Sequence, residues 1–287
     1  MHSDIYWIWI SRVEISAKSK LLLLKKYKNP KNIWNLKEDD LVNILSQNEV
    51  KKLFNQKYKQ SLNGELNYIR KYNIKIINLY HNYYPENLKN IYDAPVCLYA
   101  IGNIHRLKEK SIAIVGTRKC SEYGKTIAFK SAYELSQNNI NIISGLAKGI
   151  DTYAHMGAGE RTIAVLGSGL NILYPSENIK LAKRIINKGG LIISEYGIGV
   201  GPKRLHFPNR NRIISGISSG VIVVEAKKRS GSLITADFAL EHGKDVFAVP
   251  GNITSINSEG TNNLIKEGAI PYTGIEEVLN IYNKNNI

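Results

Sequence analysis

The sequence is poor in the residues that build disulfide-held or metal-held scaffolds. Its 287 residues include two cysteines, Cys97 and Cys120, and six scattered histidines. Two cysteines cannot form a disulfide framework, and no Cys/His cluster has the spacing of metal ligands. The sequence therefore argues against a disulfide-rich secreted protein and predicts neither a metal site nor a cofactor. A reducing compartment is the natural expectation.

Long apolar runs are also absent. The N-terminal run Ile5–Ile10 lies between Asp4 and Arg12 and is too short for a signal-peptide core or a membrane span. Elsewhere the longest apolar runs have four to seven residues. The sequence predicts a cytoplasmic protein with no membrane contact.

Acidic residues are few beside the basic ones. The chain has 24 Asp and Glu against 39 Lys and Arg, a formal net charge of +15, and its 43% hydrophobic content is too high for a disordered chain. It also holds 29 Lys and 30 Asn, an excess that a compositionally biased genome produces as well. Two interpretations of the charge stay open: lysines scattered over a solvated surface, or a basic site for an anionic partner.

Glycine is nearly missing from the first third of the chain. Residues 1–105 contain Gly64 and Gly102, whereas the other 21 of the 23 glycines lie between Gly116 and Gly274. Because the length suits two domains, this shift predicts a helical domain plus a connecting segment over 1–105 and a second domain over 106–287. In the first part, apolar residues at helical spacing predict helices at Ala17–Tyr27, Asp39–Asn48 and Glu65–Tyr72, followed by turns and short extended pieces over Ile74–Asn103.

Short β-branched runs alternate with helical stretches in the second part. The predicted strands are Ser111–Val115, Ile140–Ile143, Thr162–Leu166, Leu191–Ser194, Val221–Val224 and Asp245–Val249, with helices such as Gly124–Gln137 and Leu233–His242 between them. Continuous apolar strands separated by amphipathic helices are typical of a parallel sheet covered on both faces. The fold class is therefore predicted as α/β, with a Rossmann-like, doubly wound, mostly parallel sheet and a small N-terminal helical domain.

Cations follow two of the predicted strands at the point where each strand ends. Gly116, Thr117 and Arg118 come after the first strand, and Lys148 comes after the second. Ligands of doubly wound sheets bind beyond the carboxyl ends of the strands. The fold itself calls for glycine turns there, but a turn needs no cation, and a guanidinium matches the geometry of a phosphate. These residues predict an anion site.

A second cluster of basic residues lies between the fourth and fifth predicted strands. The segment 202–212 holds Lys203, Arg204, Phe207, Arg210, Asn211 and Arg212. Cations interleaved with an aromatic ring are expected where a nucleic-acid backbone is neutralised and a base stacks on the ring. The alternative is a solvated basic helix start, with Phe207 packed into the core.

Several enzyme motifs are missing or misplaced. There is no G-x-x-x-x-G-K-[ST] string, and the turn after the first strand is not G-x-G-x-x-G, which disfavours P-loop and dinucleotide-binding proteins. Gly216–Gly220 matches G-x-S-x-G but lies between a helix and a strand, the wrong place for a nucleophile elbow. Of the acids at strand ends, Glu195 and Glu225 have no neighbouring histidine or metal cluster, and Asp151 is expected to cap the helix beside it.

Four strings in this order resemble a known family. Ile114–Arg118, Ser144–Thr152, Phe207–Gly216 and Gly231–Ala236 together resemble the DNA-processing protein A family, also called DprA or Smf. The resemblance covers residues 111–279, and Tyr84–Pro85, Asp93–Pro95 and Gly102–Asn103 resemble the segment that leads into the core.

The resemblance implies a non-catalytic protein that binds incoming single-stranded DNA in natural transformation, shields it and helps to load the RecA recombinase. Carried over from the family, the pocket has Gly116, Thr117 and Arg118 on a backbone phosphate. Phe207 stacks on the next nucleotide beside Lys203 or Arg204, and Arg210, Asn211 and Arg212 complete the cradle. The resemblance also implies a homodimer formed through the late Rossmann region, roughly Gly231–Ile270.

The chain departs from the family pattern in two places. Its N-terminal part resembles a SAM-like module, but Ile15–Lys20 lacks the glycine of the hairpins with which some relatives contact duplex DNA. Many relatives continue into a winged-helix domain, and none is expected here because the sequence stops at Ile287.

Two other functions stay open. One is a Rossmann-like hydrolase of nucleoside monophosphates, in which Glu225 would polarise the ribose; such enzymes resemble one another in a P-G-G-x-G-T run, and this chain has Lys228–Leu233 instead. The other is a scaffold role in protein binding for the N-terminal domain.

Overall fold

A nine-stranded sheet forms the centre of the molecule in the computed structural model, which describes residues 4–54 and 62–284. The strands are β1 (Lys75–Asn78), β2 (Cys97–Gly102), β3 (Ser111–Val115), β4 (Asn141–Ser144), β5 (Thr162–Leu166), β6 (Leu191–Ser194), β7 (Gly220–Val223), β8 (Asp245–Ala248) and β9 (Ile270–Pro271). Their order is β1-β2-β6-β5-β4-β3-β7-β8-β9. β3 to β9 run parallel, and β1 and β2 add an antiparallel edge. The predicted α/β fold with a mostly parallel sheet is confirmed.

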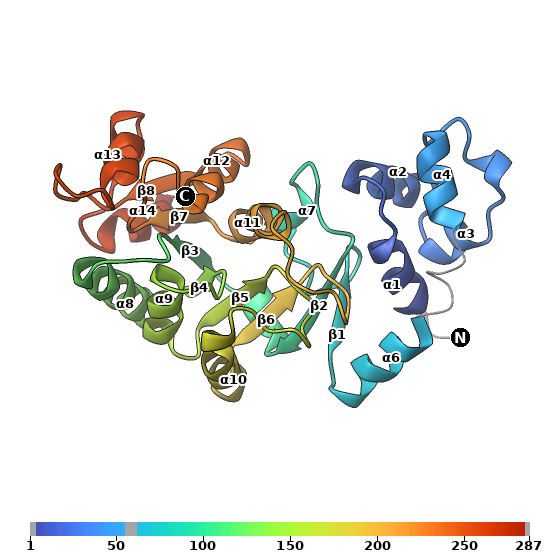
Figure 1. Ribbon diagram of the computed structural model, residues 1–287, viewed down its shortest axis with the longest axis horizontal. Coiled ribbons are helices and arrows are strands. Elements are labelled where there is room, and N and C mark those ends of the chain that lie inside the picture. The colour runs from blue at the N-terminus through green and yellow to red at the C-terminus, as the bar shows by residue number, and fades with distance from the viewer. Residues whose placement is uncertain (1–3, 55–61, 285–287) are drawn as a thin grey trace.

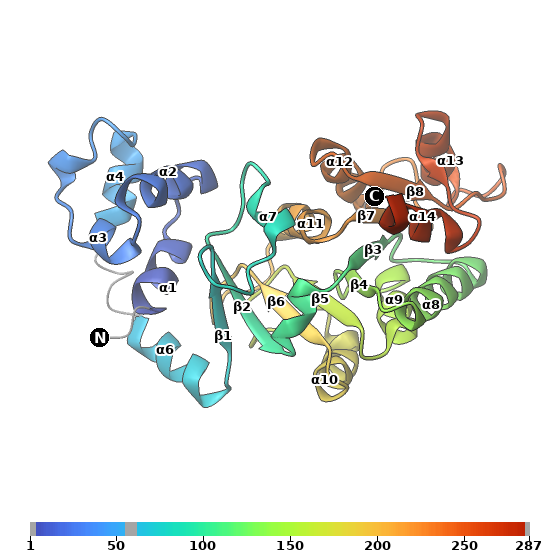
Figure 2. The ribbon, with the colours of Figure 1, turned by 180° about the vertical axis from the view of Figure 1, so that it is seen from behind.

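Helices cover both faces of this sheet, and the N-terminal helices lie beside its β1 end (Figure 1). They are α1 (Asp4–Arg12), α2 (Ala17–Tyr27), α3 (Pro30–Trp34), α4 (Gln47–Phe54), α6 (Leu62–Lys71), α7 (Glu86–Lys89), α8 (Glu122–Gln137), α9 (Ile150–Ala158), α10 (Ile179–Asn187), α11 (His206–Ile217), α12 (Gly231–Glu241), α13 (Glu259–Lys266) and α14 (Glu276–Lys284), with 3-10 turns η1 (Glu38–Asp40), η2 (Ile104–Lys108) and η3 (Ser176–Asn178). In Figure 1, α11 and α12 lie above the strands and α8, α9 and α10 lie below them. Figure 2 shows the same layers from behind.

The strands alternate their side chains between these layers, as a pleated sheet requires. In β3, Ala113 and Val115 pack with α11 and α12, whereas Ile112 and Ile114 pack with α8 and α9. All five residues of β3 are buried. Burial on both faces explains why these strands read as continuous apolar runs in the sequence.

The chain reverses its direction of travel across the sheet at β3. From β3 it moves outward through β4, β5 and β6, and it then crosses back to form β7, β8 and β9 on the other side. β3 pairs with both β4 and β7. The carboxyl ends of β3 and β7 are thus a topological switch point, where the loops diverge and leave a crevice.

The connecting segment joins this sheet. β2 pairs antiparallel with β6, with Tyr99 opposite Ser194, and β1 pairs with β2. The connecting segment therefore contributes two strands to the sheet, at its residues 75–78 and 97–102, rather than forming a tail of the helical part. The division into domains at residue 105 and the SAM-like assignment stay predictions.

One predicted helix is wrong. Asp39–Asn48 is not helical: a 3-10 turn covers Glu38–Asp40, and α4 starts only at Gln47. Ser46 and Glu49 explain the later start, because the Glu49 carboxylate accepts from the Ser46 amide at 3.3 Å and from its hydroxyl at 3.0 Å. This is a capping-box pairing, and its S-x-x-E signal is present in the sequence.

The N-terminal helices share a hydrophobic core with the sheet. Trp7 and Trp9 of α1 belong to the same buried cluster as Tyr99 of β2, Ile192 of β6 and Ile185 of α10. Ring contacts add to it, since the rings of Trp7 and Tyr80 lie 5.6 Å apart in an edge-to-face arrangement. The helical part is thus packed against the β1–β2–β6 side of the sheet (Figure 1).

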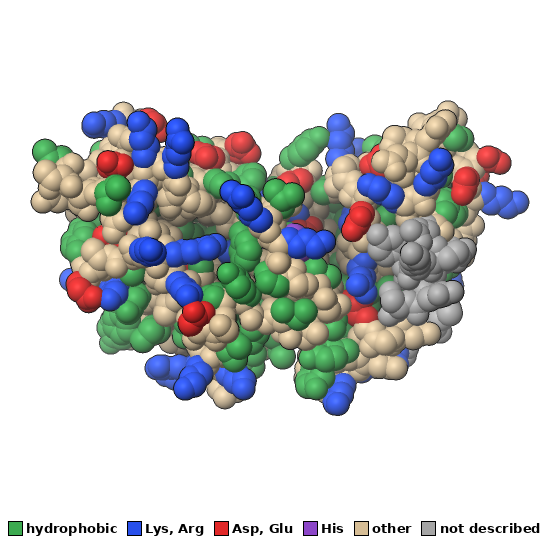
Figure 3. Space-filling model, in the orientation of Figure 1, with side chains coloured by type: hydrophobic (Ala, Val, Ile, Leu, Met, Phe, Trp, Pro, Cys, Tyr) green, Lys and Arg blue, Asp and Glu red, His purple; other side chains and the backbone are tan. Residues whose placement is uncertain are grey.

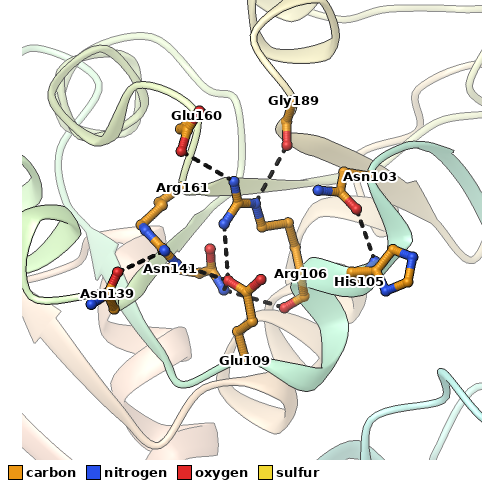
Figure 4. A network of polar contacts seen from close by, with 9 residues as sticks. All are labelled: Asn103, His105, Arg106, Glu109, Asn139, Asn141, Glu160, Arg161 and Gly189. Carbon is orange, nitrogen blue, oxygen red and sulfur yellow. Dashed lines mark hydrogen bonds and ion pairs between the residues drawn. The ribbon is translucent and has the colours of Figure 1, made fainter.

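A polar network closes the amino-terminal edge of the sheet (Figure 4). Glu109 accepts from both Arg106 and Arg161 at 2.9 Å and from the Asn141 amide group at 3.0 Å. Arg106 also donates to the Gly189 carbonyl at 3.4 Å. Although burial raises the pKa of Glu109, these donors and charges hold it below its usual value. Two of the ten arginines are thereby held at the edge of the sheet opposite the switch point.

Candidate nucleic-acid interface

A cleft opens at the switch point, beyond the carboxyl ends of β3 and β7. Its volume is about 730 Å³. Lining residues come from four places: the turn after β3 (Val115–Arg118), the segment leading into α11 together with its first turns (Pro202–Arg204, Phe207–Pro208, Arg210–Asn211, Ile214), the loop after β7 with the start of α12 (Lys227, Arg229–Ser232, Ile234–Thr235), and Ala147, Asp151 and Tyr174. The cleft therefore brings together the two segments that the sequence singled out separately.

The turn after β3 is held firmly by its neighbours. The Thr117 amide donates to the Glu225 carbonyl at 2.8 Å, and the Thr117 carbonyl accepts from the Ile150 amide at 3.2 Å. The Glu225 carboxylate accepts from the amide and hydroxyl of Ser121, at 2.9 and 2.5 Å. Gly116, Thr117 and Arg118 are thus presented on a fixed turn, with Arg118 exposed at the mouth of the cleft. Glu225 is buried and holds this loop, and it is not among the residues that line the cleft.

Phe207 stands at the centre of the cleft wall. Its ring lies 5.6 Å from the ring of Tyr174, and the Arg118 guanidinium lies 5.6 Å from its centroid. The side chain is half-buried and belongs to none of the three hydrophobic clusters of the described chain. Gly167 lets the ring approach, since a Cβ there would lie 3.1 Å from it. The core interpretation of Phe207 is therefore wrong, and the lining of the cleft includes an aromatic ring, the kind of surface on which a base stacks.

Arg210 lies beneath this ring at the floor of the cleft. The side chain is buried and donates to the Val165 carbonyl at 2.5 Å, while its Nε has no hydrogen-bond partner within residues 4–54 and 62–284. Burial lowers its pKa to about 10, partly offset by Asp151, so the guanidinium stays charged at neutral pH. Gly145 leaves room for this guanidinium, because a Cβ there would lie 1.9 Å from Nη1 and would displace the Arg210 side chain.

The backbone amides of the loop after β4 donate hydrogen bonds to side chains of α9, the helix that follows this loop. Asp151 accepts from the amides of Gly145 and Ala147 at 3.0 and 3.3 Å, and His155 accepts from the Leu146 amide at 3.2 Å. Burial lowers the pKa of His155 to about 3, so it is a neutral acceptor. The expectation that Asp151 caps its helix is wrong, because Gly149 is the N-cap and the carboxylate reaches back to the preceding loop. These amides are not free to bind phosphate.

Lys148 lies to one side of the cleft. Its ammonium group pairs with Glu177 of η3, and it lines a small side pocket that shares Arg118, Tyr174 and Phe207 with the main cleft. The sequence predicted Lys148 at the anion site. The structure places it at the rim instead, because its ammonium group pairs with Glu177 and the Asn178 side chain ties the preceding residues Leu146 and Ala147 to η3.

Arg212 is not brought into the cleft. Its side chain is 7% exposed and bridges two carboxylates, Asp93 at 3.1 Å and Glu195 at 2.5 Å. Burial alone would lower the pKa of Arg212, but these two carboxylates raise it. The structure thus disagrees with the prediction that Arg212 completes the cradle, since this guanidinium joins α11 to the end of β6 and to the segment after α7.

The lining includes two cations and an aromatic residue that were not predicted as site residues. Lys227 and Arg229 follow β7, and Tyr174 lies in the segment between β5 and η3. A signal for the first two existed, because they follow a predicted strand end in a basic run, as Arg118 does. Nothing in the sequence pointed to Tyr174, whose position depends on how the β5–α10 connection folds back over the cleft.

The charge of the cleft is strongly positive. Its lining holds six cations, Arg118, Lys203, Arg204, Arg210, Lys227 and Arg229, against the single acid Asp151. None of the six forms an ion pair with a described residue. All except Arg210 are exposed. Such cations, together with an aromatic ring in the same cleft, suit a polyanion whose bases can stack.

A comparison with protein families gives a match over most of this architecture. Residues 75–283 match the family described as DNA recombination-mediator protein A. The chain belongs to this family. The matched range begins at β1 and so includes the whole sheet and every residue that lines the cleft.

Relatives within the family are similar over much of their length. The DNA processing protein DprA of Streptococcus pneumoniae is 51% identical over 199 residues, which are 68% of this chain and 70% of that protein. Protein Smf of Escherichia coli is 42% identical over 224 residues, 77% of this chain and 60% of that protein.

Two solved structures of DNA processing protein A share the fold. The S. pneumoniae structure has a TM-score of 0.83 at 40% identity and covers 96% of each chain. The Helicobacter pylori structure, described in terms of its single-stranded DNA binding mode, has a TM-score of 0.68 at 31% identity, with 75% of this chain and 97% of that chain covered.

Across the described residues of this protein, no helix is long and apolar enough to cross a membrane.

The N-terminal helices are hydrogen-bonded to the loop that leads into the cleft. They precede the range matched to the DNA recombination-mediator protein A family. Glu65 of α6 is 3% exposed at its side chain, pairs with Arg12 of α1 at 2.6 Å and accepts from the Ile198 amide at 2.8 Å. Ile198 lies in the segment between β6 and α11 that carries Lys203 and Arg204 into the cleft. Glu65 therefore acts as a bridge between the helical part and one wall of the cleft.

Replacing Glu65 by Ala is expected to lower the free energy of unfolding by about 1–2 kcal/mol and to weaken oligonucleotide binding several-fold, because a buried amide and a guanidinium lose their shared acceptor. Denaturant titration and fluorescence anisotropy measure the two effects. Glu65→Gln keeps an oxygen for the Ile198 amide and should recover most of the binding. If both variants bind as the wild type does, Glu65 does not position this loop.

Proposed function

We propose that this protein binds single-stranded DNA in the cleft, without catalysis, during natural transformation and DNA processing. One observation carries the proposal: five exposed cations that form no ion pair with a described residue line the same cleft as the half-buried ring of Phe207. The cations would neutralise the phosphates, and the ring would stack on a base in a sequence-tolerant way. Membership of the family and the DNA-binding mode described for the H. pylori protein support the same conclusion.

Gly116, Thr117 and Arg118 would hold a backbone phosphate, and Lys203 and Arg204 would flank the nucleotide stacked on Phe207. Lys227 and Arg229 lie on the opposite wall and extend the proposed site. Asn211 donates to the Gly231 carbonyl at 3.1 Å and so positions α11 against the start of α12. We place Arg212 outside this set because its guanidinium is already paired.

The proposal extends to what happens to the bound strand in a cytoplasmic setting. Shielding of incoming single strands and loading of RecA follow as the roles expected for a member of this family. A homodimer would form through the late Rossmann region, Gly231–Ile270. Exposed apolar side chains in that region support this, namely Leu240 at 59%, Ile253 at 90% and Ile256 at 57% exposure.

The structure offers less support for a nucleotide hydrolase. The Glu225 carboxylate accepts hydrogen bonds from the amide and the hydroxyl of Ser121. Asp151, the one acid of the cleft lining, accepts hydrogen bonds from two backbone amides. Both carboxylates thus already accept hydrogen bonds that hold the loops around the cleft. Incubation with nucleoside monophosphates tests this alternative, and release of free base would favour it over the binding role.

Arg118→Ala is expected to make the salt dependence of single-strand binding shallower. The logarithm of affinity should fall linearly with the logarithm of salt concentration, and loss of one phosphate contact should reduce that slope by about 0.7. Anisotropy titrations of a labelled oligonucleotide across a salt series measure the slope.

Lys119→Ala is the matched control, because Lys119 is the neighbouring exposed cation and does not line the cleft. It should leave the slope unchanged. Equal slopes for the wild type and Arg118→Ala would remove Arg118 from the proposed phosphate contacts.

A further inference from the structure

Helix α10 carries a one-sided basic face. Its buried side chains are Ala182 and Ile185, which pack into the cluster shared with the N-terminal helices. The exposed positions are Lys180, Lys183, Arg184, Asn187 and, at the C-cap, Lys188. These positions follow the helical repeat of three and four residues, so they form one continuous stripe on the side away from the core.

No acid among the described residues pairs with a cation of this stripe. Other helices of this lysine-rich chain pair their cations internally: on α8, Lys125 pairs with Glu122 and Lys130 with Glu134. α10 contains no acidic residue, and neither its three cations nor Lys188 at its C-cap forms an ion pair with a described residue. Like charges three or four residues apart oppose helix formation by about 0.2–0.5 kcal/mol per pair. A bound polyanion would relieve that repulsion.

The stripe begins at the rim of the DNA cleft. Tyr174 and Pro175 line the side pocket that joins the cleft at Arg118 and Phe207, and η3 and α10 follow directly along the chain. In Figure 3, Lys and Arg side chains are spread over the sheet-containing half of the molecule and reach its lower edge, where α10 lies in Figure 1. Nine residues at about 1.5 Å per residue give the helix a length of roughly 13 Å.

We propose that the exposed basic face of α10, with Lys180, Lys183, Arg184 and Lys188, binds the phosphate backbone of single-stranded DNA that continues out of the cleft. This inference rests on the proposed function of the cleft. The face carries no aromatic side chain, so the contact is made to phosphates alone and does not depend on base sequence. Lys148, held by Glu177 between the cleft and the helix, lies along the same path.

The test compares two lengths of labelled oligothymidylate, about 4 and about 20 nucleotides, which bracket the site sizes common for single-strand binders. The variant replaces Lys180, Lys183, Arg184 and Lys188 by Gln, a good helix former. Its matched control replaces Lys25, Lys26, Lys28 and Lys31, four exposed cations of the helical part, and so has the same net charge. Circular dichroism checks that both variants keep their helix content.

The α10 variant should bind the short oligonucleotide like the wild type and the long one about tenfold or more weakly at low salt. Its salt slope for the long oligonucleotide should be shallower by as much as ~2.8, four contacts at ~0.7 each. Unchanged binding of the long oligonucleotide, or an equal loss in the control variant, would overturn the role of α10. Arg118→Ala separates the two proposals, because it should weaken both lengths; if the wild type binds neither length, the proposed function fails as well.

Discussion

Arg212→Met is expected to lower the free energy of unfolding by about 3–5 kcal/mol, because it leaves two carboxylates without the cation between them. Arg212 is 7% exposed at its side chain and pairs with Asp93 and Glu195. Removal of one partner of a buried ion pair costs far more than the pair contributes, since the remaining charge stays desolvated. Denaturant titration at neutral pH measures the loss, and the folded variant should still bind single-stranded DNA.

Two companion variants sharpen this prediction. Arg204→Met removes an exposed cation of the cleft that has no ion pair with a described residue, so it should change stability by less than about 0.5 kcal/mol while weakening DNA binding. Adding Asp93→Asn and Glu195→Gln to Arg212→Met should restore part of the lost stability. The opposite pattern, normal stability with impaired binding in Arg212→Met, would return Arg212 to the DNA cradle that the sequence predicted.

Phe207→Ala should weaken single-strand binding by about 1–3 kcal/mol, up to roughly a hundredfold in affinity, because a base loses its stacking surface. The ring has the right surroundings for this: Arg118 lies over one side at 5.6 Å, and Tyr174 flanks it at 5.6 Å. Anisotropy titration of a short oligonucleotide measures the effect. Phe207→Trp keeps a stacking surface and should retain most of the affinity.

Leu205→Ala is the matched control for Phe207. Leu205 is 74% exposed, lies two residues away and does not line the cleft, so its removal should leave affinity unchanged. Thermal denaturation of Phe207→Ala guards against an effect through stability. An affinity equal to that of the wild type in a folded Phe207→Ala protein would mean that no base stacks on this ring.

The strands show how much of the fold could be predicted from the sequence. Ser111–Val115, Thr162–Leu166 and Leu191–Ser194 were predicted with the bounds that the structure has, and β4, β7 and β8 differ by one residue at an end or by a shift of one. These strands are buried on both faces, so an uninterrupted apolar run marks each of them. β1 and β2 were harder to recognise because they form the edge of the sheet, where Lys75 is exposed and pairing depends on a distant partner, β6.

The candidate site was also partly predictable from the sequence and partly decided by the fold. Local sequence placed Gly116, Thr117, Arg118, Lys203, Arg204 and Phe207 at strand ends or in their loops, and the fold brings all six to one cleft. Arg210 and Arg212 were given the same role, yet they separate, because residues two apart on a helix differ by about 200° in direction. Arg210 therefore points to the cleft floor and Arg212 to Asp93 and Glu195.

The net charge of +15 shows which property of the cations the sequence determines and which property the fold determines. By itself, the sequence determined that cations are abundant and that several arginines follow strand ends, since both facts depend only on order along the chain. Only the tertiary structure decided which of them are free. Arg12, Arg106, Arg161 and Arg212 are ion-paired, whereas Arg118, Arg204 and Arg229 are exposed and have no ion pair with a described residue. The reason is physical: a carboxylate far away in the sequence neutralises a cation only when packing brings the two within contact, and no local pattern records that distance.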